Sequence, residues 1–275
     1  MSVRRLKCAV ELVRADDIRV SLRSYPPGYD QPKHAHPVTH LTLVLGGSIQ
    51  ETVGSRCERA GPLSVVLKPA GVGHADSIGP WGADTFQVWV PERVTQGALD
   101  FKIRSLRWRW LHGGSVARQM LLLLRDLRGR RYPHTGRCQQ HENLQKEVFS
   151  ILAQVGREEQ VSLDQKAAPE WLLEVKESID ARALHGLRVP RLAAEARVHP
   201  IYLARLFRRY FGCSVCGYIK QARFRATATL IQRSGTALTE IAFRAGFSDQ
   251  AHMCREFKTG TGLTPRVFRE LTGAQ

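Results

Sequence analysis

The sequence predicts an α+β multidomain protein, with a β-barrel or sandwich at the N-terminus and an all-α domain at the C-terminus. Two observations support this prediction. Short apolar runs alternate with turn signals as far as about residue 92, a pattern typical of an antiparallel β-domain. From residue 169 onward, apolar side chains recur at helical spacing, and two stretches of that region repeat one another.

The predicted β-domain covers residues 1–92. Its clearest strands are Ile18–Leu22, Leu41–Leu45 and Leu63–Leu67, and glycine- or proline-rich segments separate them. Runs of this length at close spacing are typical of a small barrel rather than of a parallel sheet, because parallel strands need long crossover connections.

The middle of the chain changes to helical periodicity. Residues 93–156 contain apolar side chains at helical spacing over Ser115–Leu127 and His141–Val155, where we expect helices that flank the barrel. We expect the same region to provide a dimer surface. The polar stretch 157–168 is a predicted linker, and 169–275 is the all-α domain.

Charge and composition restrict the class of protein. The chain carries 41 lysine and arginine residues against 25 acidic ones, a net charge of +16. Residues 181–275 have 16 basic and 5 acidic side chains, so most of the surplus lies there. Such a surplus favours polyanionic partners. The sequence has no apolar run of about 18 residues, no signal-peptide pattern and only scattered cysteines, which predicts a cytoplasmic protein without a membrane partner.

The internal repeat predicts two helix-turn-helix units. The pattern Leu192-Ala193-x-x-Ala196-x-Val198 recurs 49 residues later as Ile241-Ala242-x-x-Ala245-Gly246-Phe247. Small residues let two helices cross closely, and Gly246 tolerates a positive φ. Ser248 or Asp249 can cap the following helix, and His199 occupies that position in the first copy. The alternative is a pair of amphipathic hairpins without a DNA-binding role.

Both copies resemble the AraC/XylS family of regulators. The resemblance rests on Thr239–Gln250, on Gly262-Leu263-Thr264-Pro265 and on Tyr202–Arg209, and it covers about residues 170–271. It implies two helix-turn-helix units joined by a long helix over Val215–Arg233, a double-stranded DNA operator, a small-molecule effector, a homodimer and contact with RNA polymerase.

The family pattern places base contacts on the outer face of each second helix. Arg205 and Arg255 are candidates for pairing with guanine, and Gln250 for adenine, although each arginine could instead contact phosphate or solvent. The full set of candidate DNA-binding residues is Ile201, Tyr202, Ala204, Arg205, Gln250, Ala251, Cys254 and Arg255.

Four histidines form a second constellation in the β-domain. His34, His36 and His40 share one strand parity, and His74 follows the turn Pro69-x-Gly71. Imidazoles that converge inside a small barrel would suit a divalent metal ion such as zinc. A metal-free polar ligand pocket and purely structural hydrogen bonds are the alternatives. The same four histidines and Trp89 are the candidate effector-binding residues.

The spacing of these histidines resembles the two motifs of the cupin barrel. In that pattern a carboxylate is expected where His40 stands, and this departure argues against oxygenase chemistry. The resemblance implies a cupin-like sensor domain, and we expect no enzyme activity and no catalytic residues. The expected protein is an AraC-type transcription regulator controlled by a metal or small molecule. The alternative is a cupin-type metalloenzyme fused to a DNA-binding module.

Overall fold

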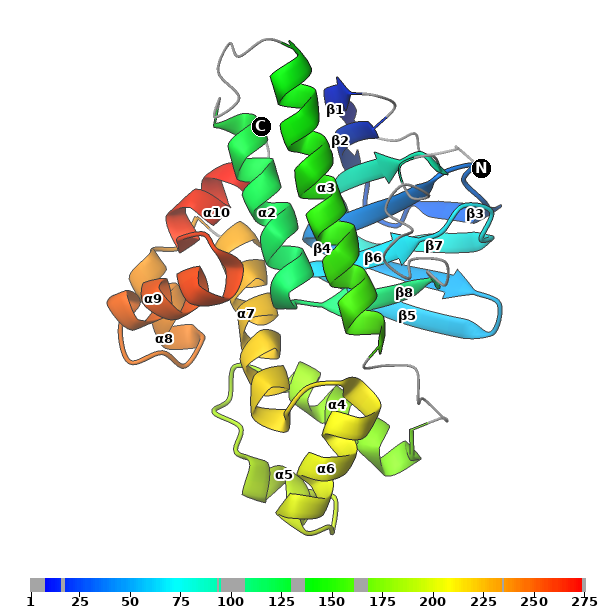
Figure 1. The fold of residues 1–275 in the computed structure, drawn as a ribbon. Helices are drawn as coiled ribbons and strands as arrows, with labels where there is room; N and C mark the ends of the chain where they lie inside the picture. The colour runs from blue at the N-terminus through cyan, green and yellow to red at the C-terminus, as the bar shows by residue number, and fades with distance from the viewer. Residues whose placement is uncertain are drawn as a thin grey trace.

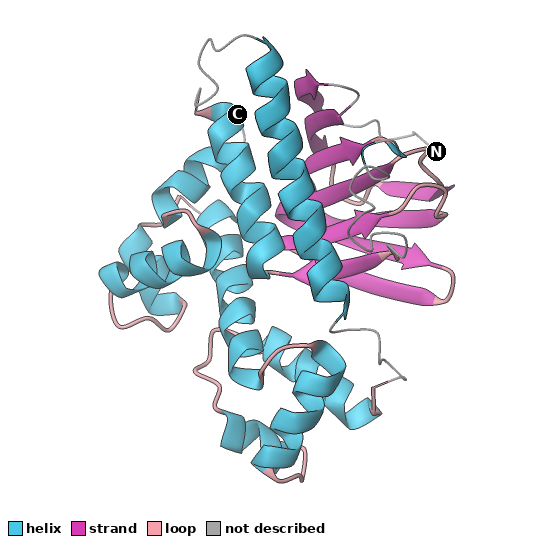
Figure 2. Ribbon diagram, viewed as in Figure 1, coloured by secondary structure: helices cyan, strands magenta, loops and turns pink. Residues whose placement is uncertain are grey.

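The computed structural model describes residues 8–15, 18–92, 94, 107–129, 137–160, 168–233 and 235–273. A sheet-containing N-terminal part is covered by two helices, and the remaining helices form the C-terminal part (Figures 1 and 2). The predicted α+β class is confirmed at this level. Residues 161–167, most of the predicted linker, lie outside the described residues.

The β-domain is an eight-stranded antiparallel sheet with the order β1-β2-β7-β4-β6-β8, to which β3 adds on β7 and β5 adds on β4. The strands are β1 (Cys8–Ala15), β2 (Ile18–Tyr25), β3 (Asp30–His34), β4 (Thr39–Val53), β5 (Arg56–Ala60), β6 (Ser64–Lys68), β7 (His74–Val90) and β8 (Arg109–His112). Strand β8 pairs with β6, so the sheet continues past the predicted boundary at residue 92 into the region predicted to be mainly helical.

The long strands β4 and β7 run through both halves of the sheet. They pair over 39–47 with 83–90 and again over 49–52 with 75–78, with register shifts between the two segments. Their second paired segment forms one half together with β3 and β5, and their first segment forms the other half with the remaining strands. Side chains bridge the halves: Trp108 Nε1 donates to Glu51 Oε1 at 2.9 Å, and His112 Nε2 lies 2.7 Å from Glu58 Oε1. We call the face between the halves the inner face.

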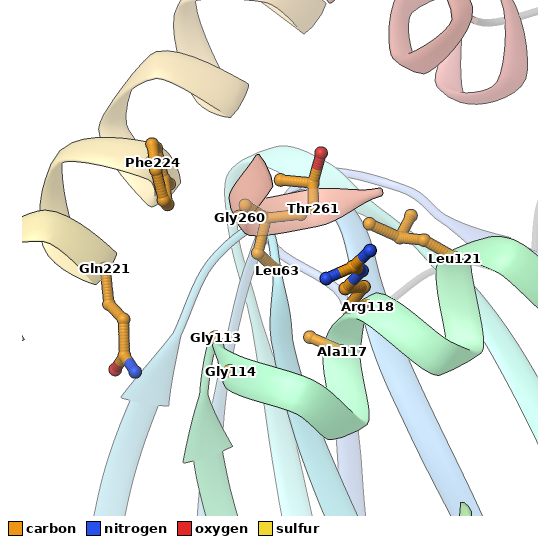
Figure 3. A pocket seen from close by; sticks show the side chains of 10 residues that line it. All are labelled: Leu63, Gly113, Gly114, Ala117, Arg118, Leu121, Gln221, Phe224, Gly260 and Thr261. Carbon is orange, nitrogen blue, oxygen red and sulfur yellow. The ribbon is translucent and has the colours of Figure 1, made fainter. Parts of the chain in front are cut away.

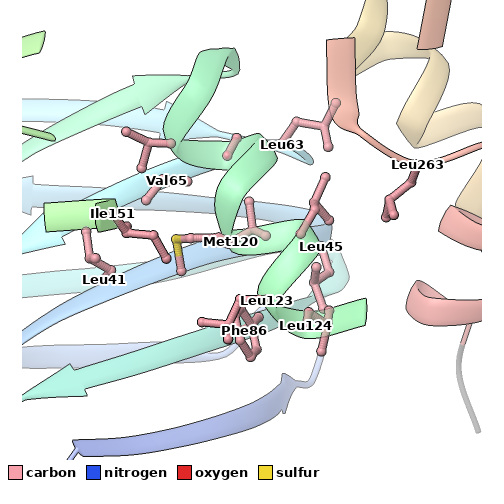
Figure 4. Close-up of a cluster of buried hydrophobic side chains, with 14 of the residues drawn as sticks. Leu41, Leu45, Leu63, Val65, Phe86, Met120, Leu123, Leu124, Ile151 and Leu263 are labelled. Atoms are coloured by element: carbon pink, nitrogen blue, oxygen red, sulfur yellow. The ribbon is translucent and has the colours of Figure 1, made fainter. Parts of the chain in front are cut away.

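The opposite, outer face of the sheet is apolar and is covered by α2 (Gly114–Arg128) and α3 (Arg137–Gln160). Both predicted helices in this region are therefore confirmed. Figure 4 shows Met120, Leu123 and Leu124 of α2 among strand residues Leu41, Leu45 and Phe86. Alternation along each strand sends these apolar side chains outward and leaves the polar ones on the inner face.

The C-terminal part is all helical where it is described, as predicted. Its helices are α4 (Glu170–Ala181), α5 (Val189–Glu195), α6 (Pro200–Phe211), α7 (Val215–Arg233), α8 (Leu238–Arg244), α9 (Gln250–Thr261) and α10 (Pro265–Thr272). Helix α7 has the bounds that the sequence predicted for the long connecting helix. None of the described helices is long and apolar enough to cross a membrane.

These helices pack in two separate cores. Helices α4, α5 and α6 form one core with the first half of α7, around Leu172, Leu203 and Phe207. Helices α8, α9 and α10 instead share the large core of the β-domain, where Phe257 and Phe268 belong to the same cluster as Met120 of α2. In Figure 1 the second group lies beside α2, and the first group lies further away along α7.

Candidate functional sites

The second helix pair, α8 and α9, has the features that a tight helical corner requires. Ala242 and Ala245 are buried at the crossing, and Gly246 adopts φ +72° in the turn. Asp249 then caps α9, since the backbone N–H of His252 donates to Asp249 Oδ1 at 2.7 Å. Of the two caps that the sequence allowed, the structure uses Asp249.

The two faces of α9 differ in burial. Met253 and Phe257 are fully buried, whereas Gln250, Ala251 and Arg255 are exposed. Cys254 is half-buried beside them. The predicted reading residues of this helix therefore lie on its free side, where they could reach the edges of bases in a major groove.

The first helix pair, α5 and α6, makes the same corner with different residues. Arg197 occupies the position of Gly246 and adopts φ +54°, a left-handed conformation that is unfavourable for a residue with a Cβ atom. His199 caps α6, because the Ile201 N–H donates to its Nδ1 at 3.3 Å. Ile201, Tyr202, Ala204 and Arg205 are all exposed on α6, as predicted for reading residues.

An aromatic contact that the sequence did not indicate supports the face of α6. The ring of Trp171, at the start of α4, stacks on Tyr202 with centroids 6.1 Å apart and an interplanar angle of 22°. The guanidinium of Arg205 lies 5.4 Å from the Tyr202 ring centroid. These contacts restrict the rotamers of two candidate reading residues. Periodicity could not reveal them, because Trp171 and Tyr202 lie on different helices, far apart in the chain.

The different turn residues lead to opposite stability predictions. Arg197→Gly should stabilise the first helix pair by up to about 1 kcal/mol, since relief of the left-handed strain exceeds the cost of glycine's flexibility. Gly246→Ala should destabilise the second pair by about 1–2 kcal/mol, because a Cβ there would also lie 3.1 Å from the Leu184 carbonyl oxygen. Urea midpoints of the full-length variants test both signs. A loss of stability in Arg197→Gly would contradict the inference that the left-handed backbone at Arg197 is strained.

The second helix pair is docked on the β-domain through polar contacts as well as the shared core. Arg118 Nη1 of α2 donates to the Thr259 carbonyl at 3.4 Å, and Arg128 Nη1 donates to that of Leu271 at 2.7 Å. Arg225 Nη1 of α7 donates to the carbonyl of His112, on β8, at 3.0 Å. These contacts tie both ends of α2 to α9 and α10, and the last strand to α7.

A small pocket marks this junction (Figure 3). Four segments meet at the pocket: the residue before β6, the start of α2, the middle of α7 and the end of α9. Arg118 of α2 and Phe224 of α7 are among its lining residues. Helix α2 begins there at Gly114, after the cap residue Gly113, and both glycines have positive φ (81° and 86°). Gln250 and Ala251 lie at the other end of α9, and Arg255 is exposed in its middle, so docking leaves these candidate residues accessible.

On the inner face of the β-domain the structure brings the four predicted histidines together. Ring centroids are 4.8 Å apart for His34 and His36, 4.3 Å for His34 and His74, and 4.6 Å for His36 and His40. Candidate ligand nitrogens of His34, His36 and His74 all lie within 4.8 Å of one another. His40 is outside that group and stacks on Trp89, with centroids 4.2 Å apart.

The hydrogen bonds of this cluster fit a metal ion. Nδ1 of His34 lies 2.9 Å from the Pro32 carbonyl, and Nδ1 of His74 lies 3.0 Å from that of Val72. Donation to these carbonyls places the proton on Nδ1 and leaves the lone pair on Nε2. Both Nε2 atoms are buried and have no hydrogen-bond partner among the described residues. Buried acceptors of this kind are what a divalent metal ion requires.

The electrostatics of the cluster favour the neutral form of His36, His40 and His74 by lowering the pKa of each. Burial, followed by the nearby His74, His34, Lys68 and Arg23, lowers the pKa of His36 to about 4. Burial also lowers the pKa of His40 and that of His74. Neutral imidazole is the form that binds metal, so protons would compete little for His36 and His74.

A buried group of charged side chains borders the histidines, and sequence reasoning missed it. Lys68 Nζ lies 3.2 Å from Glu51 Oε1 and 3.4 Å from Asp76 Oδ2. Burial raises the pKa of Glu51 to about 7, against the opposing effect of Lys68. Glu51, His74 and Asp76 could also hold a cation, but the Lys68 ammonium already serves their carboxylates. The histidine group is therefore the better candidate metal site.

Comparisons with known proteins agree with the helical part of this description. Residues 192–271 match the model of a helix-turn-helix domain family. The chain is 38% identical over 72 residues to the transcriptional activator RhaR of Cronobacter sakazakii, covering 26% of this chain and 25% of RhaR. It is 31% identical over 85 residues to PqrA of Proteus vulgaris, a probable transcription factor, covering 31% of this chain and 70% of PqrA.

A solved structure of ToxT from Vibrio cholerae is similar over 94% of this chain and 99% of that chain, with 10% identity and a TM-score of 0.39. The match to the family model runs from α5 to α10. The chain spans only a quarter of RhaR but more than two thirds of PqrA, at over 30% identity. The chain therefore belongs to the AraC-type family of helix-turn-helix transcription regulators.

Proposed function

We propose that this protein binds a double-stranded DNA operator through both helix pairs, each acting as a helix-turn-helix unit, and that its β-domain controls this binding. In this proposal α6 and α9 are the reading helices. Helix α7 has 19 residues and is therefore about 30 Å long, close to one turn of DNA. That length supports the insertion of both reading helices into successive major grooves.

The docking of the second helix pair on α2 is the observation that supports control of DNA binding by the β-domain. A ligand in the β-domain can shift DNA affinity only if it favours one arrangement of these parts over another. The shared apolar core and the carbonyl contacts of Arg118 and Arg128 supply a physical connection for such a preference. The first helix pair has a core of its own, and Arg225 links that core to the β-domain by contacting both Asp180 of α4 and the His112 carbonyl of β8.

The proposed signal is a divalent metal ion or a small molecule bound on the inner face. A zinc ion would be held by His34, His36 and His74, and it would supply a fixed positive charge that a ligand could neutralise. His40 and Trp89 would border it rather than coordinate it. The family membership supports regulation rather than catalysis as the purpose of this site.

The proposal includes a homodimer. The sequence assigned the dimer surface to the helical region 93–156, and within it α2 is enclosed between the sheet, α3 and the second helix pair. Helix α3 is thus the better placed of the two to meet a second copy. Activation of transcription would further require contact with RNA polymerase, as the family resemblance implies.

The control can be tested with an uncoupled variant. An operator is first selected from random duplexes with the full-length protein, and its Kd is measured with zinc and with a chelator. We expect the two values to differ by about 5- to 150-fold in the wild type. In Arg118→Ala/Arg128→Ala the difference should shrink, because both carbonyl contacts are lost while the shared apolar core remains.

Arg157→Ala is the matched control. Arg157 is exposed on α3 and bonds within that helix to Gln154, so the zinc effect should persist in this variant. Equal operator affinity with and without zinc in the wild type would contradict metal control. An unchanged zinc effect in the double variant would contradict the docked helix pair as its route.

A further inference from the structure

The inner face of the β-domain carries a polar row beside the histidines. Ser21 pairs with Gln87, and Gln87 pairs with Thr42, so the three side chains are cross-strand neighbours on β2, β7 and β4. All three are buried, with 9%, 5% and 3% of their surfaces exposed. Ser21 Oγ, Gln87 Oε1 and Thr42 Oγ1 each lack a hydrogen-bond partner among the described residues.

The cross-strand neighbours on either side of this polar row include positively charged side chains. On one side Arg19, Trp89 and His40 are aligned across the same strands, and on the other side Arg23 pairs with Thr85. The Arg19 and Arg23 guanidiniums lie 5.4 and 5.2 Å from the Trp89 ring centroid. Arg23 Nε is buried and unpartnered among the described residues, and so is Nδ1 of His40.

Arg19 and Arg23 have no ion-pair partner among the residues that the structure describes. Lys68, by contrast, is paired with Glu51 and Asp76. Buried polar groups normally have partners, and the buried Nε of Arg23 has none among the described residues. Water could satisfy the hydroxyls and the amide, but it would leave the guanidinium charge uncompensated.

We propose that the β-domain binds a small organic carboxylate on this patch. The Arg23 guanidinium and the hydroxyls of Ser21 and Thr42 donate to its oxygens, and Trp89 lies against its carbon skeleton. A planar guanidinium matches carboxylate geometry better than any other side chain does. Gln87 Oε1 accepts from a hydroxyl or ammonium of the ligand. This inference rests on the proposed sensor role, because it names the chemical class of the signal.

The patch borders the metal candidate without overlapping it. The His36 ring lies edge-on to Trp89, with centroids 5.0 Å apart, and His40 stacks on the same indole. Carboxylate binding and metal binding therefore involve different donor atoms, and each can be measured alone. Anionic charge beside three imidazoles and Lys68 would also favour a divalent cation there, so the two ligands should bind cooperatively.

The test uses acetate and its neutral analogue acetamide on the full-length protein, stripped of metal and at constant ionic strength. Calorimetry should give an acetate Kd on the order of millimolar and no saturable acetamide signal. Arg23→Gln should weaken acetate binding by about tenfold or more, and Arg23→Lys should recover part of it. Arg59→Gln, which removes an exposed arginine of β5, should bind acetate as the wild type does.

Three outcomes would overturn the assignment. They are the absence of acetate binding at acetate concentrations well above millimolar, equal binding of acetamide and acetate, and undiminished acetate binding in Arg23→Gln. Zinc uptake and operator affinity are measured on the same samples, which separates the two claims. If zinc still changes operator affinity but acetate does not bind, only the carboxylate proposal is overturned. Acetate binding without any change in operator affinity leaves the ligand site in place and contradicts the sensor role.

Discussion

Replacing Arg255 with alanine should weaken binding to the selected operator by about 5- to 150-fold, with a much smaller loss on random DNA. Arg255 is exposed on the free side of α9, away from the buried Met253 and Phe257. From that position its guanidinium can donate to both acceptors of a guanine in the major groove. The wrong base leaves these donors unpaired, so the loss depends on the sequence.

The matched control for this variant is Arg266→Ala. Arg266 is also exposed, but it lies on α10 and pairs with Glu270 one turn later. The substitution removes the same charge from the same domain without touching the predicted reading face. Operator affinity should therefore fall only by the general electrostatic contribution of one charge.

The salt dependence distinguishes base contact from phosphate contact. Each phosphate contact contributes about 0.9 to the slope of log K against log salt. If Arg255 contacts a base, the slope of Arg255→Ala should remain close to that of the wild type. An equal loss on both DNAs, together with a slope reduced by about one, would reassign Arg255 to the phosphate backbone.

Local sequence patterns predicted the helices well because each helix is specified by nearby residues. Helix α7 begins after the cap Ser214, whose Oγ accepts from the Gly217 N–H at 3.0 Å, and its predicted bounds agree with the structure. The corner of the second helix pair was equally visible, through Gly246 and Asp249. The corner of the first was predicted without its strained residue, since Arg197 carries no turn signal.

What the sequence could not predict depends on long-range contacts. Buried charges such as Lys68 and Glu51 would be expected at the surface from their residue types, and only the pairing of strands far apart in the chain brings them together. Strand β8 has only 4 residues and lies next to a helix, so its periodicity is too short to detect. The docking of α9 and α10 on α2 likewise has no signal within any one segment.

The candidate metal site contains one feature that the sequence predicted and one that it could not predict. Motif spacing brought four histidines to attention, and the structure does gather them on the inner face. The spacing could not show which of them share a ligand position. That depends on ring orientation, which the carbonyl contacts of His34 and His74 and the stacking of His40 on Trp89 determine.

Replacing both His34 and His74 with alanine should lower zinc affinity by more than about 100-fold, since two of three ligands are lost. In the structure each donates from Nδ1 to a carbonyl and presents a buried Nε2 without a partner among the described residues. Elemental analysis of untagged protein and competition with a chromophoric chelator measure the effect. Zinc retained at wild-type stoichiometry and affinity in this variant would contradict the site.

Two single variants sharpen the same measurement. His40→Ala removes the stacking on Trp89 but no member of the His34, His36 and His74 group, so zinc affinity should fall far less than in the double variant. His185→Ala removes an exposed imidazole outside the β-domain and controls for adventitious zinc. If His40→Ala instead weakens zinc as strongly as the double variant, four imidazoles share the ion, and a carboxylate on Arg23 would then have to bind beside a metal whose protein ligands already complete its tetrahedral coordination.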